Sequence, residues 1–204
     1  IDITKNAQFE SLDFKYEKCT KVRSYIPTPV ASKESLSEAA ALINAAEKPF
    51  IIFGQGVILS EGEKELKDFV EKSGIPAAWT VLGLSALETS HPLNVGMVGM
   101  HGNYGPNMLT NECDVLIAIG MRFDDRVTGN LETYAKQAKL IHFEIDPAEV
   151  DKNVKTAVAV LGDAKVSLRE ILPLIDENSH EAWLENFHKH YEIEYEEVIK
   201  NEIY

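Results

Sequence analysis

Short apolar runs alternate with amphipathic stretches along most of the 204-residue chain. The apolar runs have no polar face and end in glycine or acidic residues, which is typical of strands that are buried on both sides of a sheet. The pattern predicts five strands, which lie in the segments PFIIFGQG, IPAAWTVLG, DVLIAIG, AKLIHFEID and TAVAVLGD.

The amphipathic stretches predict helices between and after these strands. Ser35 with Glu38, and Ser60 with Glu63, have the spacing of a capping box, and Asp163 stands where an N-cap is expected. The last helix carries an aromatic stripe that could pack on the domain itself or on a neighbour. The predicted helical segments are SLSEAAALINAAEK, SEGEKELKDFVEKSG, NMLTNE, AKVSLREILPLI and HEAWLENFHKHYEIEYEEVIKN.

Strands that alternate with helices, and that are apolar on both faces, predict an α/β fold. We expect a Rossmann-like parallel sheet of about five to six strands with helices on both faces. Open parallel sheets bind their ligands at the carboxyl ends of the strands. The residues that directly follow each apolar run are therefore the first candidates for a binding site.

Charge and composition exclude several classes of partner. A net charge of -13 argues against nucleic acid, because phosphate contacts need clustered Lys and Arg. No apolar run approaches the ~20 residues of a membrane-spanning helix, and no signal-peptide pattern is present. Cys19 and Cys113 lie far apart without metal-ligand spacing, so we expect a reducing, cytoplasmic location and no metal site.

The residues after the apolar runs are individually ambiguous. Gly54, Gln55 and Gly56 resemble the start of a dinucleotide fingerprint, but Leu59 stands in place of the third glycine, so a tight turn explains them equally well. Glu144 could accept hydrogen bonds from ribose hydroxyls or could be a solvated turn residue. Taken one at a time, these residues do not establish a site.

Two glycine- and arginine-containing loops are more informative. MVGMHGNYGPN and the Gly96 that precedes it place four glycines within ten residues, which would let the backbone approach a ligand, although a mobile surface loop is the alternative. RFDDRVTG places Arg122 and Arg126 on either side of Asp124 and Asp125. Guanidinium forks suit pyrophosphate and carboxylate, and the aspartates could hold the arginines in place. A surface ion-pair cluster is the alternative, but the position after a strand favours binding of a nucleotide-like ligand.

The strings GMHG, GMRFDDRVTG and HFEIDPAEVDKN resemble the middle domain of the catalytic subunit of acetohydroxyacid synthase, also called acetolactate synthase. The resemblance runs from about residue 22 to about residue 175. RFDDRVTG is specific, because related thiamine-dependent enzymes share the fold but not this string. Gln55 departs from the family pattern, in which a small residue is more usual. The opening IDITKN resembles the end of the preceding thiamine-binding domain.

This resemblance implies a three-part organisation. Residues 1–31 would be the end of a thiamine-binding domain and a linker, residues 32–176 a central FAD-binding domain, and residues 177–204 a helical linker toward a C-terminal thiamine-diphosphate domain. The complete family enzyme condenses pyruvate with pyruvate or 2-ketobutyrate in branched-chain amino acid synthesis. Its flanking domains bind thiamine diphosphate and Mg²⁺, so this chain alone is expected to be inactive. A homo-oligomer and a regulatory small subunit are also implied.

The resemblance also assigns roles to individual residues. No catalytic residue is expected in this chain, while Met100, Asp125 and Arg126 would border the substrate pocket. Arg122 would serve the cofactor and Arg126 the substrate. A related carboligase, such as a glyoxylate carboligase, or a stand-alone nucleotide-binding module are the alternatives. The implied FAD contacts are Gly54, Gln55, Gly56, Thr80, Leu82, Met100, His101, Gly120, Arg122, Asp124, Arg126, Val127, Glu144, Ile145, Asp163 and Ala164.

Overall fold

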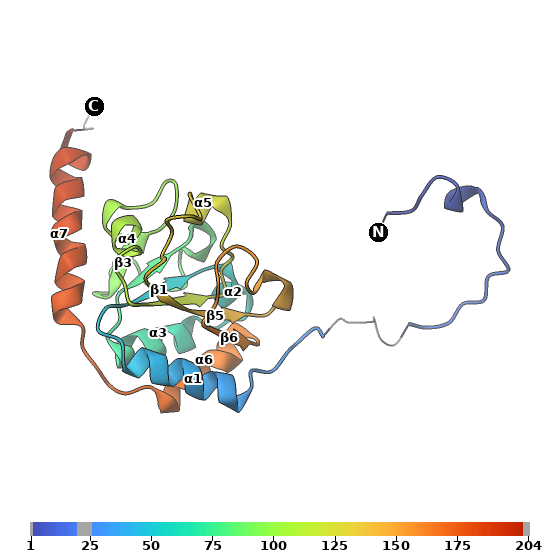
Figure 1. Cartoon of the computed structure of the whole chain (residues 1–204), viewed down its shortest axis with the longest axis horizontal. Helices are drawn as coiled ribbons and strands as arrows, with labels where there is room; N and C mark the ends of the chain where they lie inside the picture. The colour runs from blue at the N-terminus through green and yellow to red at the C-terminus, as the bar shows by residue number, and fades with distance from the viewer. Residues whose placement is uncertain (1, 20–25, 202–204) are drawn as a thin grey trace.

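Six strands form one parallel sheet in the computed structural model, which describes residues 2–19 and 26–201. The strand order is β3-β2-β1-β4-β5-β6 (Figure 1), the order of doubly wound nucleotide-binding sheets. The predicted α/β fold with a parallel sheet is therefore confirmed. The strands are β1 (Pro49–Phe53), β2 (Ala77–Trp79), β3 (Asn94–Met97), β4 (Val115–Ile119), β5 (Lys139–Glu144) and β6 (Val158–Leu161).

Strand β3 is the one strand that the hydrophobic pattern did not predict. It lies in the glycine-rich stretch, contains Gly96, and is only partly buried at the edge of the sheet. An edge strand pairs on one side only, so it needs neither a continuous apolar run nor strong β-propensity. The segment IPAAWTVLG is also shorter as a strand than predicted, because Val81–Gly83 turn into a 3-10 helix, η2.

Helices cover both faces of the sheet. α1, α3 and α6 pack on one face, and α4 and α7 lie on the other (Figure 1). Short 3-10 segments join several of these elements. The helices are α1 (Lys33–Asn44), α2 (Gln55–Leu59), α3 (Glu63–Ser73), α4 (Tyr104–Leu109), α5 (Asp125–Thr128), α6 (Ala164–Ile171) and α7 (Glu181–Glu197), and the other 3-10 segments are η1 (Ala7–Phe9), η3 (Pro147–Glu149), η4 (Leu172–Leu174) and η5 (Ile199–Asn201).

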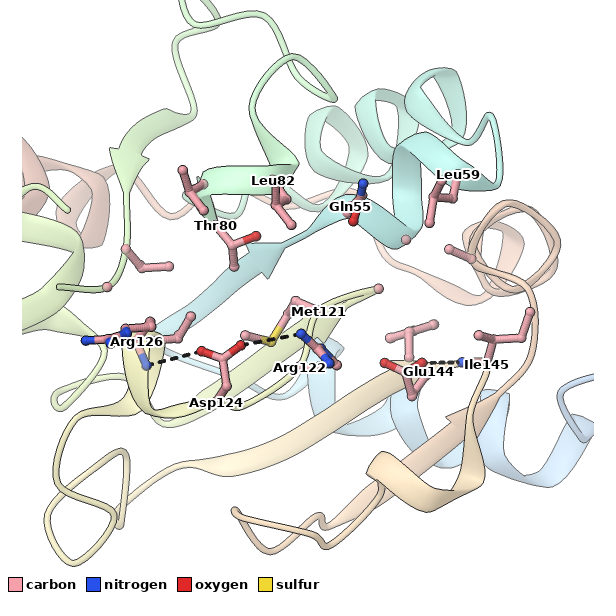
Figure 2. Close-up of a pocket in the computed structure, with 18 of the residues that line it drawn as sticks. Gln55, Leu59, Thr80, Leu82, Met121, Arg122, Asp124, Arg126, Glu144 and Ile145 are labelled. Carbon is pink, nitrogen blue, oxygen red and sulfur yellow. Dashed lines mark hydrogen bonds and ion pairs between the residues drawn. The ribbon is translucent and has the colours of Figure 1, made fainter. Parts of the chain in front are cut away.

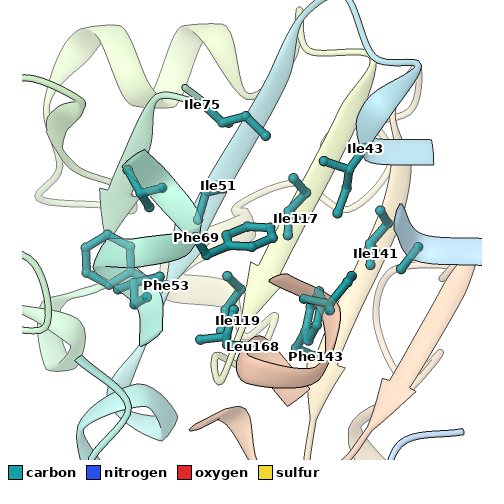
Figure 3. Packing of buried hydrophobic residues seen from close by; sticks show 14 of the residues in the cluster. Ile43, Ile51, Phe53, Phe69, Ile75, Ile117, Ile119, Ile141, Phe143 and Leu168 are labelled. Atoms are coloured by element: carbon teal, nitrogen blue, oxygen red, sulfur yellow. The ribbon is translucent and has the colours of Figure 1, made fainter. Parts of the chain in front are cut away.

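The larger apolar core lies between the sheet and helices α1, α3 and α6. Figure 3 shows Phe69 of α3 and Leu168 of α6 against strand residues such as Ile117 and Ile119, and all four are fully buried. Complete burial of a side chain of this size stabilises the fold by roughly 1.5–3 kcal/mol. This layer fixes the strand ends from which the site is built.

Helix α7 covers part of the second face of the sheet, and part of its aromatic stripe packs there. Trp183 and Phe187 are buried against this face, and the Trp183 indole N–H donates to the carbonyl of Pro49 at 2.9 Å. Phe50 and Phe187 place their ring centroids 5.0 Å apart. Tyr191 and Tyr195 remain exposed farther along the helix. The first half of the stripe therefore packs on the domain.

Two predicted capping boxes are wrong. Ser32, rather than Ser35, caps α1, and its hydroxyl accepts from the Ser35 N–H at 3.0 Å. Gly62 occupies the N-cap position of α3, because the Ser60 hydroxyl instead donates to the Val57 carbonyl at the end of α2. The third predicted cap is confirmed, since Asp163 accepts from the N–H of Val166.

The N-terminal residues 2–19 do not pack on this fold. They are exposed throughout and contain only the short segment η1. Part of the predicted linker, residues 20–25, lies outside the described residues. Across the described ranges, every helix is too short or too polar to span a bilayer.

The order of the strands reverses between β1 and β4. The chain segments that leave these two strands come unusually close to one another. The Gly56 N–H donates to the carbonyl of Gly120 at 2.9 Å, directly after the two strands end. Gly120 has a φ of +57°, and a Cβ on it would lie 2.8 Å from the Cα of Gly56. Only glycine combines this backbone conformation with this approach.

We predict that Gly120→Ala lowers the free energy of unfolding by several kcal/mol. Backbone strain contributes roughly 1–3 kcal/mol, and the overlap with Gly56 adds to it. Gly129→Ala is the control, because Gly129 has the same φ of +57° but a Cβ on it would meet no atom within 4 Å. Urea unfolding of both variants tests this, and equal losses would show that the close approach is not important.

Candidate functional site

A cavity of about 750 Å³ opens at the carboxyl ends of the strands, directly over the Gly56–Gly120 approach. This volume is within the range of about 300–1,000 Å³ that is common for small-molecule sites. Figure 2 shows the cavity between two rows of side chains, with Thr80, Leu82 and Gln55 on one side and Arg122 and Glu144 on the other. The position is the one expected for an open parallel sheet.

Most of the residues implied by the resemblance line this cavity. Gly54 does not, because it is buried beneath it, where a Cβ would lie 2.6 Å from the Gly120 carbonyl oxygen. Asp125 does not either, and is instead the exposed first residue of α5. The implied residues that line the cavity are Gln55, Gly56, Thr80, Leu82, Met100, His101, Gly120, Arg122, Asp124, Arg126, Val127, Glu144, Ile145, Asp163 and Ala164.

The cavity also has lining residues that the resemblance did not assign as cofactor contacts. Several neighbour predicted residues, so their position after a strand was a usable signal, as with Met121 and Gly162. Met97 and Val98 were hidden because β3 itself was not predicted. The additional lining residues are Leu59, Ser60, Val81, Met97, Val98, Gly99, Met121, Phe143 and Gly162.

Glu144, the last residue of β5, is held rigidly at one end of the cavity. One carboxylate oxygen accepts from the backbone N–H groups of Ile145 at 2.9 Å and Asp146 at 3.1 Å. The other oxygen lies 3.6 Å from the buried ring of His142. Burial favours a raised pKa for Glu144, but the nearby His142 ring and the hydrogen bonds from the two backbone groups outweigh it and lower the pKa. Glu144 therefore presents an oriented, ionised carboxylate.

His142 links this carboxylate to the neighbouring strand end. Its Nε2 lies 3.0 Å from the Met121 carbonyl oxygen. A carbonyl can only accept, so Nε2 carries the proton. The ring is fully buried and meets Phe123 edge-on at 5.2 Å between centroids. The end of β5 and the segment that leaves β4 are thus fixed to one another.

The charged run after β4 forms the middle of the cavity. Asp124 caps α5 by accepting from the Arg126 N–H at 3.1 Å, and it lies 3.8 Å from the Arg122 guanidinium. The Arg122 side chain is 66% exposed, so this ion pair contributes little to stability. Asp124 thus orders the start of α5, while the guanidinium groups of Arg122 and Arg126 stay exposed.

The glycine-rich loop after β3 is the wall next to Arg126. Its Met100 N–H donates to the Arg126 carbonyl at 2.8 Å, and the Arg126 guanidinium lies 3.6 Å from the Met100 sulfur. Asn107 of α4 both donates to and accepts from the backbone of Gly99 at 2.9 Å. The loop is therefore held by hydrogen bonds both to α4 and to Arg126.

The structure also describes one buried cysteine, Cys113, which does not line the cavity. Cys113 is buried, and burial raises the pKa of its thiol to about 12, which keeps it protonated. Among the residues that the structure describes, no group of three or more His, Cys, Asp or Glu side chains could hold a metal ion. The arrangement can bind an elongated ligand with hydroxyl and anionic groups.

Comparison with known proteins agrees with this geometry. Residues 36–171 match the family described as thiamine pyrophosphate enzyme, central domain. The chain is 42% identical over 179 residues to a probable acetolactate synthase large subunit of Methanococcus aeolicus, and 42% identical over 195 residues to one of Methanocaldococcus jannaschii. It is 40% identical over 172 residues to the acetolactate synthase large subunit of Corynebacterium glutamicum.

These three alignments cover 86%, 93% and 84% of this chain but only 30%, 33% and 28% of the relatives. The chain thus spans about a third of the length of these relatives. They support the resemblance that RFDDRVTG and its neighbouring strings indicated. On the strength of the match over residues 36–171, the chain belongs to the thiamine pyrophosphate enzyme central-domain family.

Proposed function

We propose that this chain is the FAD-binding central part of an acetolactate synthase large subunit. The observation that carries the proposal is the cavity over the β1–β4 switch point, with an oriented carboxylate at one end and two exposed arginines in its middle. The relatives, which are named acetolactate synthase large subunits, favour this enzyme over a glyoxylate carboligase or an isolated nucleotide-binding module.

The chemistry of the lining fits the parts of FAD in order. Glu144 would accept from the ribose hydroxyls of the adenosine half, with Ile145, Asp163 and Ala164 beside it. Arg122 would neutralise the pyrophosphate, because a guanidinium fork matches phosphate oxygens. The close backbone around Gly56 leaves room for the ribityl chain.

The remaining lining suits a flat ring system. Leu82 and Met100 are large apolar side chains, 59% and 61% exposed, that border the cavity opposite and beside the arginines. A flavin ring would bury these surfaces, which otherwise contact water at a cost of about 25 cal/mol per Å². FAD would act here as a bound group without net redox change.

In the complete enzyme, segments 1–31 and 177–204 would connect the central domain, residues 32–176, to flanking domains. Those domains would bind thiamine diphosphate and Mg²⁺ and carry the condensation of pyruvate with pyruvate or 2-ketobutyrate. Met100, Asp125 and Arg126 would border the substrate pocket that the domains complete. We further propose a cytoplasmic homo-oligomer with a regulatory small subunit. The chain by itself would bind FAD but form no acetolactate.

The direct test is titration of the chain with FAD, followed by quenching of flavin fluorescence. We expect saturable one-to-one binding that is weaker than in the complete enzyme, because flanking domains would cover part of the flavin. A chain that is folded by circular dichroism yet leaves flavin fluorescence unchanged would contradict the proposal.

Glu144→Ala should lower FAD affinity by about 10- to 100-fold, since hydrogen bonds to a charged group are worth roughly 1.5–3 kcal/mol. Glu38→Ala is the matched control, because Glu38 is an exposed residue of α1 that carries the same charge. The control should bind FAD like the unmodified chain. Equal affinities for both variants would show that Glu144 does not contact the cofactor.

Arg126→Lys should impair use of the second ketoacid by about 10- to 100-fold in the complete enzyme, because Lys lacks the bidentate fork that a carboxylate prefers. FAD binding and pyruvate decarboxylation should persist. Arg122→Lys is the comparison and should instead weaken FAD. The opposite pattern, with FAD lost only in Arg126→Lys, would reverse the roles of the two arginines.

A further inference from the structure

Helix α7, which lies far along the chain from the residues that line the cavity, makes a polar contact with the start of α4. The Glu194 carboxylate accepts from the Tyr104 backbone N–H at 3.2 Å and from the Asn103 side-chain amide at 3.2 and 3.3 Å. The two helices lie side by side (Figure 1), with the rings of Tyr104 and His190 5.3 Å apart. Glu194 thus supplies the side-chain cap that Asn103, the N-cap residue of α4, does not.

Asn103 also binds the backbone of Met97, the last residue of β3. Its side-chain carbonyl accepts from the Met97 N–H at 2.9 Å, and its backbone N–H donates to the Met97 carbonyl at 2.8 Å. With its oxygen used by Met97, the amide places its nitrogen toward the Glu194 carboxylate. One side chain therefore ties α7 to the residue where the cavity wall begins.

The wall itself continues from Met97 to His101, and all five of its residues line the cavity. It is anchored at Gly99 by Asn107, one turn along α4 from Asn103, and at Met100 by the Arg126 carbonyl. Gly99 has a φ of +106°, and a Cβ there would lie 2.7 Å from that same carbonyl oxygen. Because the wall is hydrogen-bonded to α4 on one side and packs closely on Arg126 on the other, we expect a displacement of α4 to move the wall.

We propose that Glu194 is a positioning residue for the ligand cavity, which acts from α7 through Asn103 on the wall formed by residues 97–101. Its hydrogen bonds go to Asn103 and Tyr104, which lie outside the wall. The choice of FAD as the ligand rests on the proposed function, but the mechanical link between α7 and the wall does not. Binding of FAD and docking of α7 are then coupled, and the coupling is reciprocal.

Glu194→Gln isolates the contact without removing packing volume. A carboxylate can accept from both the Asn103 amide and the Tyr104 N–H, whereas the glutamine amide would direct its own N–H groups at one of these donors. Glu192→Gln is the matched control, because Glu192 is exposed on the same helix, loses the same charge, and lies two residues from the contact.

Two measurements on the full 204-residue chain test the proposal. In hydrogen exchange without ligand, Glu194→Gln should speed exchange of the amides at residues 97–104, and Glu192→Gln should not. In FAD titrations, Glu194→Gln should raise the Kd by about three- to tenfold, and it should cause little further loss in a chain that already carries Asn103→Ala, because that variant removes the side chain through which Glu194 acts. FAD should also slow exchange in α7 of the unmodified chain but not in Glu194→Gln.

Unchanged exchange at residues 97–104 and unchanged FAD affinity in Glu194→Gln would overturn the proposal, as would equal effects of the two glutamine variants. Additive losses in the double variant with Asn103→Ala would also overturn the route through Asn103. If the unmodified chain binds no FAD, the proposed function fails instead. The exchange comparison between Glu194→Gln and Glu192→Gln then still decides whether α7 positions the wall.

Discussion

The close approach of the chain segments that leave β1 and β4 is the constraint on which the site depends. Gly56 and Gly120 meet backbone to backbone at the point where the sheet reverses its strand order. Without side chains between them, the ends of two neighbouring strands form the floor of one cavity rather than two separate loops. The buried core under α3 and α6 holds those strands in register, so packing on one side of the sheet determines geometry at its edge.

Rigid supports then present a small number of chemical groups over this floor. Glu144 is oriented by two backbone N–H groups and by His142, while Asp124 orders the segment that carries the arginines. The position of the wall formed by residues 97–101 is fixed by hydrogen bonds from α4, and α4 is contacted by α7. The cavity is therefore suited to hold a long, partly anionic ligand in place.

The sequence predicted the parts of this arrangement that depend on local pattern. Apolar runs located five strands, and the residues directly after them account for most of the cavity lining. Three kinds of feature could not be predicted from the sequence. Edge strand β3 has no buried run, the caps at Ser32 and Gly62 depend on how the preceding turn folds, and the contact of Glu194 with Asn103 joins residues 91 positions apart. Long-range contacts of this kind leave no periodic signal in one sequence.

We propose that the adenosine end of FAD lies at Glu144. Amide chemical shifts of the ¹⁵N-labelled chain test it most directly, because the N–H groups of Ile145 and Asp146 are bonded to the Glu144 carboxylate and report on its contacts. FAD and ADP should both shift these two amides, whereas FMN, which lacks adenosine, should leave them in place and shift residues near Met100. Shifts at Ile145 and Asp146 with FMN, or none with FAD, would contradict the account.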